Sequence, residues 1–220
     1  MQRIQACLFD LDGVIVDTAK FHYLAWKRLA NALGFDLTIE DNEQLKGIGR
    51  MESLDIILGI GNVTLSADEK IRYATEKNIH YLDLCKQMTP ADTLPGVQAF
   101  LESLQENHIK IGLGSASKNA PLILNQIGMS TYFEALIDGN RTSKGKPDPE
   151  VFLLGAADLQ VAPNHCVVFE DAVAGIQAAK AGNMMAIGVG NPSTLMEADF
   201  VIPGFADFTV AQMFTQFPAK

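Results

Sequence analysis

An alternation of short apolar runs and helical segments constrains the fold of this chain more than any other feature. Apolar runs typical of buried strands occupy residues 109–113, 135–137, 166–169 and 184–189, with a weaker one at 201–202. The helices expected around them begin at Pro95-Gly96 and cover residues 118–127, 149–159 and 172–181. Strands that alternate with helices form a parallel sheet with helices on both faces, so the sequence predicts an α/β fold.

The region after the first expected strand, residues 4–9, breaks this alternation. Residues 17–33 have helical periodicity closed by Gly34, and residues 51–86 carry two more helical segments, the second opened by a capping box of Ser66 and Glu69. We therefore predict a helical cap of residues 18–86 inserted after the first strand. The remainder, residues 1–17 and 87–220, forms the α/β core. Ligands bind outside the carboxyl ends of the strands in such sheets, so the cap would lie over the active site as a lid.

Two pairs of acidic residues directly follow expected strands. Asp10 and Asp12 come after residues 4–9, where a turn or helix cap is the alternative interpretation. Glu170 and Asp171 come after residues 166–169, where Asp171 could instead cap the next helix. Adjacent carboxylates at the end of a buried strand repel one another unless a cation lies between them, and Mg²⁺ prefers carboxylate oxygens.

A hydroxyl-rich turn and a lysine follow two other strands. Ser115-Ala116-Ser117, continued by Lys118 and Asn119, lies between a strand and a helix, where it either binds an anion or caps the helix. Lys146 and Lys144 share one polar loop, and spacing alone does not choose between them. Because parallel strands end at one edge of the sheet, these distant side chains can converge with the acids. Phosphoryl transfer through a carboxylate nucleophile requires such a set of residues.

These residues resemble the four motifs of the haloacid dehalogenase superfamily. The motifs appear as Asp10-Leu11-Asp12-Gly13-Val14, Ser115, Lys146-Pro147 and Glu170-Asp171. The resemblance implies a Rossmann-like parallel core with a helical cap after the first strand, and it selects Lys146 over Lys144. By this resemblance the second aspartate argues for the phosphatase and phosphomutase branch, and Asp10 is the expected nucleophile and Asp12 the expected general acid and base.

Within that superfamily the chain more closely resembles the β-phosphoglucomutase family. The similarity rests on Asp17-Thr18, His22 and Trp26, and on a run from Leu45 to Ser53. It implies that Thr18 and His22 assist catalysis, with His22 supporting the hinge and Asp12. It also implies contacts to a sugar phosphate, at Trp26, Lys46, Gly47, Arg50, Ser53, Ala116, Ser117, Lys118 and Asn119. From the sequence pattern alone, Arg50 and Lys46 would be a solvated helix start and His22 a residue of a helix face.

The family resemblance implies a reaction and a cofactor. The expected reaction interconverts β-D-glucose 1-phosphate and β-D-glucose 6-phosphate through an aspartyl phosphate and a glucose 1,6-bisphosphate. Mg²⁺ is expected on the Asp10 carboxylate, the Asp12 carbonyl and Asp171, with Glu170 nearby. A sugar-phosphate phosphatase on the same scaffold is the first alternative, and a non-catalytic binding protein is the second.

The net charge and the cysteines bear on partners and location. The chain has 220 residues and a formal net charge of −9 without a basic patch, so we expect no nucleic-acid partner. No signal peptide or run of membrane-spanning length is visible, which predicts no membrane association. Cys7, Cys85 and Cys166 fit neither a disulfide framework nor a zinc site. We expect reduced, mostly buried thiols, a cytoplasmic monomer, and small phosphorylated sugars as ligands.

Overall fold

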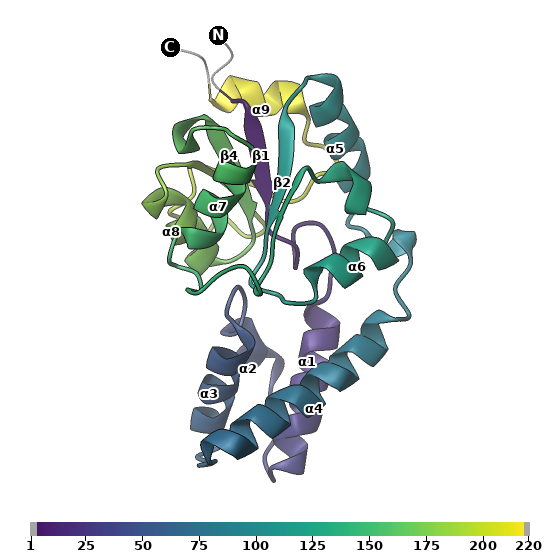
Figure 1. The fold of residues 1–220 in the computed structure, drawn as a ribbon, viewed down its shortest axis with the longest axis vertical. Helices are drawn as coiled ribbons and strands as arrows, with labels where there is room; N and C mark the ends of the chain where they lie inside the picture. Colours follow the sequence, from purple (N-terminus) through teal and green to yellow (C-terminus); the bar gives the residue numbers. More distant parts are fainter. Residues whose placement is uncertain (1–3, 218–220) are drawn as a thin grey trace.

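A six-stranded parallel sheet forms the centre of the computed structural model, which describes residues 4–217 (Figure 1). The strands are β1 (Ala6–Phe9), β2 (Lys110–Gly114), β3 (Ala135–Ile137), β4 (Cys166–Glu170), β5 (Met185–Val189) and β6 (Phe200–Ile202). Their order is β3-β2-β1-β4-β5-β6, and every neighbouring pair is parallel. Phe9 lies opposite both Leu113 and Phe169, so the three central strands end at the same level. The predicted α/β fold is confirmed.

Helices cover both faces of this sheet. They are α5 (Val97–Glu106), α6 (Ala120–Gln126), α7 (Glu150–Asp158), α8 (Val173–Ala181) and α9 (Val210–Gln216), with short 3₁₀ turns at Pro90–Asp92, Ser130–Tyr132 and Pro163–His165. Helices α5, α6 and α9 share one apolar cluster with one face of the sheet, and α7 and α8 share another with the opposite face. Helix α9 was not predicted, although Thr209 and Gln212 form a capping box at its start.

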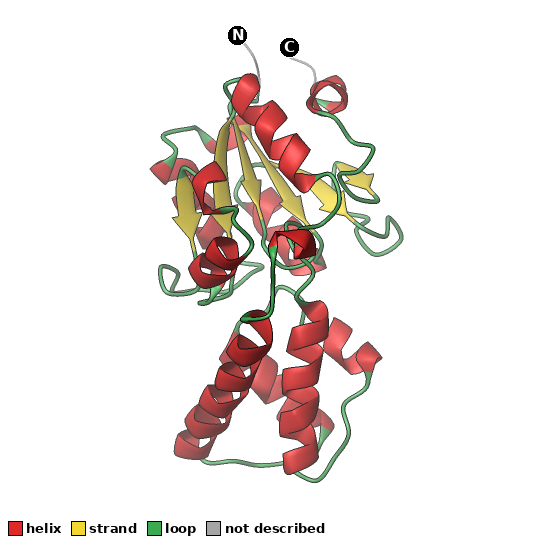
Figure 2. Cartoon of the chain, turned by 90° about the vertical axis from the view of Figure 1, so that its right-hand side faces the viewer, coloured by secondary structure: helices red, strands yellow, loops and turns green. Residues whose placement is uncertain are grey.

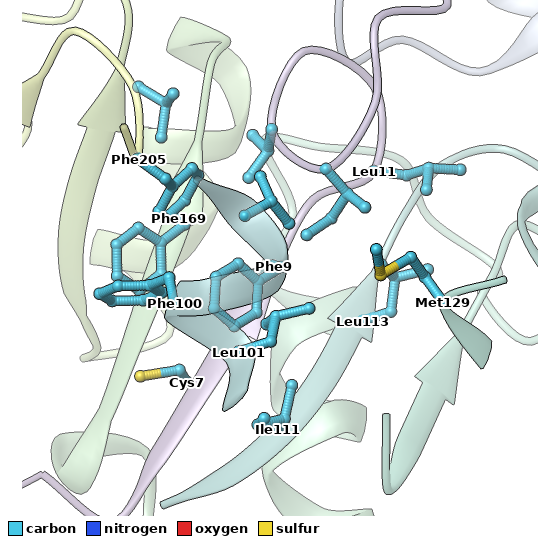
Figure 3. Close-up of a cluster of buried hydrophobic side chains, with 14 of the residues drawn as sticks. Cys7, Phe9, Leu11, Phe100, Leu101, Ile111, Leu113, Met129, Phe169 and Phe205 are labelled. Carbon is cyan, nitrogen blue, oxygen red and sulfur yellow. The ribbon is translucent and has the colours of Figure 1, made fainter. Parts of the chain in front are cut away.

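A group of aromatic rings packs together within the larger apolar cluster (Figure 3). The rings of Phe9 and Phe169, on neighbouring strands, are nearly parallel with centroids 4.8 Å apart. Phe100 of α5 meets Phe169 edge-on at 5.4 Å, and Phe205 packs on the same group. Each buried ring contributes about 1.5–3 kcal/mol by leaving water. This packing holds β1 and β4 side by side, and with them the acids that follow each strand.

Four helices form a separate body at the carboxyl end of the sheet (Figure 2). They are α1 (Ala19–Ala32), α2 (Ile39–Glu43), α3 (Arg50–Ile60) and α4 (Ala67–Cys85). Trp26, Leu54 and Ile57 belong to an apolar cluster of their own, so these helices do not depend on the sheet for a core. The capping box of Ser66 and Glu69 is present as predicted. Helix α2 was not predicted, although Thr38 and Asp41 cap its start in the same way.

The chain passes twice between the two bodies, at positions that are hydrogen-bonded together. The Leu94 amide donates to the Ile15 carbonyl at 2.9 Å, and Val16 forms an isolated antiparallel bridge with Thr93. The two passages therefore lie side by side, as a hinge requires. The domain boundaries at residues 18 and 87 remain a prediction, and residues 1–3 and 218–220 of the expected core lie outside the described residues.

Two further features bear on the expectations from composition. Cys7, Cys85 and Cys166 are buried free thiols, as predicted. Among the helices of residues 4–217, none combines the length and the apolar character needed to cross a membrane.

Candidate active site

Asp10 lies at the floor of a cleft between the sheet and the four helices. Its backbone amide donates to the Phe169 carbonyl at 3.0 Å, which continues the pairing of β1 with β4 by one residue. Asp10 is 4% exposed, and its Oδ2 accepts a hydrogen bond of 3.1 Å from the Asp12 amide. Strand pairing and this turn hold the carboxylate in one place, as a nucleophile requires.

Lys146, not Lys144, reaches the acids. The Lys146 Nζ donates to Asp10 Oδ1 at 2.6 Å and to Glu170 Oε1 at 3.3 Å, and its side chain is 1% exposed. Burial lowers the pKa of Lys146, but the carboxylates of Asp10 and Glu170 outweigh it and raise that pKa above its ordinary value. Lys144 forms an exposed pair with Asp148 at 3.1 Å. The ambiguity left by spacing is therefore resolved by packing.

The acids Asp10, Glu170 and Asp171 form a group that suits a metal ion. One carboxylate oxygen from each lies within 4.8 Å of the others. Burial and the Asp10 charge raise the pKa of Glu170 well above its ordinary value, and they raise that of Asp171 to about 7. Glu170 Oε2 is buried without a hydrogen-bond partner among the described residues. A cation would satisfy this oxygen and relieve the repulsion, so the residues present fit a metal site.

Asp171 is not the helix cap that the alternative interpretation required. The N-cap position of α8 is Ala172, which makes no side-chain capping bond. The Asp171 carboxylate instead packs on Gly13, where a Cβ would lie 2.3 Å from Oδ2. It also pairs with Lys46 of the helical body, Nζ to Oδ2 3.8 Å. The interpretation of Asp171 as a cap is therefore wrong.

Asp12 sits beside Asp10 in a position suited to moving protons. Thr18, just before α1, donates a short hydrogen bond from its Oγ1 to Asp12 Oδ1. Burial, and then the Asp10 charge, raise the pKa of Asp12 to about 6, against the opposing effect of the Thr18 bond. A carboxyl group with a pKa near the working pH can both release and accept a proton.

The turn 115–119 lies on the same edge of the sheet. The Ser115 amide donates to the Ile137 carbonyl at 2.9 Å, and Ser115 Oγ accepts from the Ser117 amide at 3.1 Å. Gly139 packs closely against the turn, because a Cβ at this position would lie 2.4 Å from the Ala116 carbonyl oxygen. Asn119 occupies the N-cap position of α6 but makes no side-chain capping bond, so the capping interpretation fails for this residue.

A single cleft of about 1370 Å³ brings most of the predicted residues together. Its lining includes Asp10, Asp12, His22, Trp26, Lys46, Gly47, Arg50, Ser53, Ser115, Ala116, Ser117, Lys118, Asn119, Lys146 and Asp171. Thr18 and Glu170 are not part of the lining, and they reach the site through Asp12 and Lys146. The roles of these residues remain predictions.

Sequence reasoning missed Lys77 of α4. This lysine is 4% exposed, and its Nζ lies 3.1 Å from His22 Nδ1 and 4.2 Å from the Trp26 ring centroid. The His22 ring packs at a tilt against the Tyr81 ring, with centroids 4.2 Å apart, while the hydrogen bond to Asp12 comes from Thr18. The expected support of Asp12 by His22 therefore remains a prediction. A signal was present, because Ala74, Lys77, Tyr81 and Cys85 follow the spacing of a buried helix face.

Lys77 gives this protein a specific pH dependence of stability. Burial, and then the Arg50 charge, lower the pKa of Lys77 from 10.5 to about 7. Between these values the unfolded chain holds the proton and the folded chain does not, so folding stability rises with pH. In urea unfolding, the free energy of unfolding of the wild type should rise relative to that of Lys77→Met. The rise should be up to about 1.4 kcal/mol for each pH unit above pH 7. A stability difference that does not change between pH 7 and pH 10 would contradict the assignment.

The fold and the site together define a class of protein. A parallel α/β core carries a buried aspartate after its first strand, with a lysine and two further acids around it and a helical cap over the cleft. This is the arrangement of an aspartate-centred phosphoryl-transfer enzyme. Residues 4–183 match the model of the haloacid dehalogenase-like hydrolases, and the chain belongs to that family.

Several relatives are similar over most of their length. The β-phosphoglucomutase of Bacillus subtilis is 44% identical over 209 residues, which cover 94% of this chain and 92% of that one. The crystal structure of β-phosphoglucomutase from Clostridium difficile superposes with a TM-score of 0.94 at 45% identity, covering 97% and 96% of the two chains. A phosphorylated carbohydrates phosphatase of Thermotoga maritima is 30% identical over 184 residues, 82% of each chain. Both enzyme classes therefore occur among the relatives.

Proposed function

We propose that this chain is a β-phosphoglucomutase, which interconverts β-D-glucose 1-phosphate and β-D-glucose 6-phosphate. The observation that carries the proposal is the single cleft, which joins the buried Asp10 to a second cationic region at Arg50 and Lys118. A mutase has to hold a bisphosphate at both ends, and a cleft with two such regions suits that task. The similarity to two β-phosphoglucomutases over more than nine-tenths of the chain supports the same function.

Phosphoryl transfer begins at Asp10. In the phosphorylated enzyme, the aspartyl phosphate at Asp10 donates its phosphoryl group to the C6 hydroxyl of glucose 1-phosphate, and the Asp10 carboxylate is the leaving group. Lys146, 2.6 Å from Asp10, neutralises charge on the transferring oxygens, and the Ser115 hydroxyl positions them. Asp12 takes the proton from the sugar hydroxyl. The 1,6-bisphosphate then turns round and returns its C1 phosphate to Asp10. Asp12 gives the proton to the C1 oxygen that leaves, and the product is glucose 6-phosphate.

Magnesium is the cation proposed for the acidic group. The carboxylates of Asp10, Glu170 and Asp171 and the main-chain carbonyl of Asp12 would hold it. These ligands are all oxygen, which suits Mg²⁺ better than a softer metal. When bound, Mg²⁺ offsets the negative charge of the acids and of the incoming phosphate.

Gly175 provides a test of the metal site in which none of the proposed ligands is itself substituted. A Cβ at Gly175 would lie 1.7 Å from Glu170 Oε1, so Gly175→Ala should displace the Glu170 carboxylate. Loss of an oriented group at a metal site typically costs about 10–100-fold in metal affinity. We expect a similar rise in the Mg²⁺ concentration that gives half-maximal activity.

Gly182→Ala is the matched control for this measurement. Gly182 ends the same helix, and a Cβ there would meet no atom closer than 3.4 Å. Its Mg²⁺ dependence should equal that of the wild type. Equal Mg²⁺ dependence of the two variants would remove Glu170 from the proposed site.

The second phosphate is proposed to bind on the far side of the sugar. Arg50, at the start of α3, and the turn residues Ser117, Lys118 and Asn119 supply the donors. Burial lowers the pKa of Arg50 from its very high ordinary value, which leaves the guanidinium charged and partly desolvated. Trp26, Lys46, Gly47 and Ser53 are proposed to contact the sugar ring between the two phosphates. Residues 18–86 would close over it as the cap.

Arg50→Ala should separate transfer to sugar from transfer to water. Arginine can hold a phosphate with two charge-assisted hydrogen bonds, so its loss should lower mutase kcat/KM by about 10²-fold or more. Water brings no remote phosphate, so hydrolysis of the phosphoenzyme should fall much less. Both rates are measured on one preparation, as glucose 6-phosphate formed and as free phosphate released. Equal losses in the two rates would contradict a role for Arg50 in sensing the remote phosphate.

A sugar-phosphate phosphatase is the second candidate, favoured by the similarity to the Thermotoga maritima enzyme. It would use the same residues but let water take the phosphate from Asp10. The deciding experiment gives the wild type β-glucose 1-phosphate and follows both products. Glucose 6-phosphate should form much faster than free phosphate, and the opposite ranking would establish the phosphatase. The monomeric state and the cytoplasmic location remain predictions.

A further inference from the structure

Two asparagine side chains meet across the cleft. Asn78 lies on α4 of the cap, and Asn119 lies at the end of the turn 115–119 of the core. The Asn119 Nδ2 donates to Asn78 Oδ1 at 2.8 Å, although the two residues are 41 positions apart in the sequence. Both side chains line the cleft. This hydrogen bond joins the cap directly to the region proposed for the second phosphate.

Local chemistry explains why the Asn119 amide is turned into the cleft. An asparagine at an N-cap usually accepts a hydrogen bond from the amide of the second or third helical residue. In α6 the second residue is Pro121, which has no N–H, so only the Leu122 amide could be capped, and Asn119 makes no side-chain capping bond to it. The side chain of Asn119 is therefore not engaged by its own helix.

The direction of this amide decides whether it attracts or repels phosphate. An asparagine has a donor face with two N–H groups and an acceptor face that repels an anion. With one N–H donated to Asn78, the other remains for a phosphate oxygen. If Asn119 turned over, its oxygen would face Asn78 Oδ1, and two acceptors would oppose each other. With Asn78 oriented as in the structure, its carbonyl favours the donor orientation of Asn119.

We propose that Asn78 is a positioning residue, which holds the Asn119 amide with its nitrogen directed at the phosphate remote from Asp10. This inference rests on the proposed function, because it takes Asn119 to contact that phosphate. It makes α4 part of substrate selection, since the contact forms only when the cap lies near the core. Substrates with a remote phosphate benefit from it, and small phosphate donors do not.

A double-mutant cycle tests the proposal. The variants Asn78→Leu, Asn119→Ala and the pair are compared with the wild type in kcat/KM for β-glucose 1-phosphate. Asn78→Leu removes one neutral hydrogen bond and should lose about 10-fold. If Asn78 acts through Asn119, the pair should be no worse than Asn119→Ala alone. Asn78→Gln keeps a carbonyl acceptor and should recover part of the loss.

Two comparisons exclude a purely structural effect. Glu76→Leu, at an exposed position of the same helix, makes a similar change outside the cleft and should match the wild type. Release of phosphate with acetyl phosphate as donor, which has no remote phosphate, should fall less than the sugar reaction does. Additive losses in the cycle, equal losses with the two donors, or no recovery by Asn78→Gln would each overturn the role of Asn78.

Failure of the proposed function would be recognised separately. A wild type that forms no glucose 6-phosphate refutes the mutase assignment by itself. The same cycle is then run on phosphate release from fructose 1,6-bisphosphate, compared with acetyl phosphate. If the effects of the Asn78 and Asn119 substitutions are non-additive with the bisphosphate but additive with acetyl phosphate, the positioning role is supported. Additive effects with both donors would overturn it.

Discussion

Asp10→Asn should abolish turnover, with a loss of at least about 10⁴-fold. The amide keeps the size of the side chain but has no anion to attack phosphorus. Asp10 is 4% exposed and is held in place by the Asp12 amide and by Lys146. Incubation with acetyl phosphate should give a phosphoryl adduct labile to alkali and to hydroxylamine in the wild type and none in the variant. The adduct is measured by intact-protein mass spectrometry.

Folding of the Asp10→Asn variant has to be checked before its loss is assigned to chemistry. The substitution leaves Lys146 facing Glu170 alone, at 3.3 Å, and lowers the number of acids at the site by one. Repulsion among the remaining acids should decrease, so the variant should unfold at a urea concentration no lower than that of the wild type. A folded variant that retained substantial turnover would refute Asp10 as the nucleophile.

Asp12→Ala should lower kcat by about 10²–10⁴-fold, the usual contribution of a general acid and base. The pKa of Asp12 is raised to about 6 because the carboxyl group is buried and lies beside Asp10. Its protonated form therefore persists to higher pH than that of an exposed aspartate, and it can supply a proton near neutrality. Substrate affinity, measured by calorimetry with glucose 6-phosphate, should change by much less than kcat.

A substitution of Thr18 provides a milder test of the same role of Asp12. Thr18→Val removes the hydroxyl that donates to Asp12 but keeps the shape of the side chain. Because that hydrogen bond lowers the pKa of Asp12, its loss should shift the acidic limb of the pH–rate profile upward. An Asp12→Ala variant impaired in KM alone would mean that Asp12 binds substrate and does not move protons.

The elements of the fold were largely predictable from local patterns. Each strand of the core carries a continuous apolar run, because both faces of a parallel sheet are covered. Capping residues marked the start of α4, and Gly34, with φ of 91°, closed α1 as expected. Helix α2 was missed because its five residues are too few to show a helical period, and α9 was missed although a capping box marks its start.

The residues of the site were largely predictable from the sequence, but the contacts between their side chains were less so. The order of acids, hydroxyls and lysine along the chain, with the family resemblance, named most residues that line the cleft. The spacing of residues could not decide whether Lys146 or Lys144 reaches the acids. It also could not decide whether Asp171 caps a helix or faces the site. Lys77 was invisible because a lysine within a helical segment is usually solvated, and only burial against Trp26 and His22 distinguishes it.

The sequence by itself therefore determined the parallel α/β core, the helical insert and the identity of the acids, since each depends on residues close together in the chain. Tertiary structure decided which side chains meet. Lys146 reaches Asp10 across 136 positions, and Asn78 reaches Asn119 across 41. Such contacts depend on the packing of whole strands and helices, which no short pattern encodes. The same packing buries the carboxyl group of Asp12 beside Asp10, and burial in turn shifts its pKa toward neutrality.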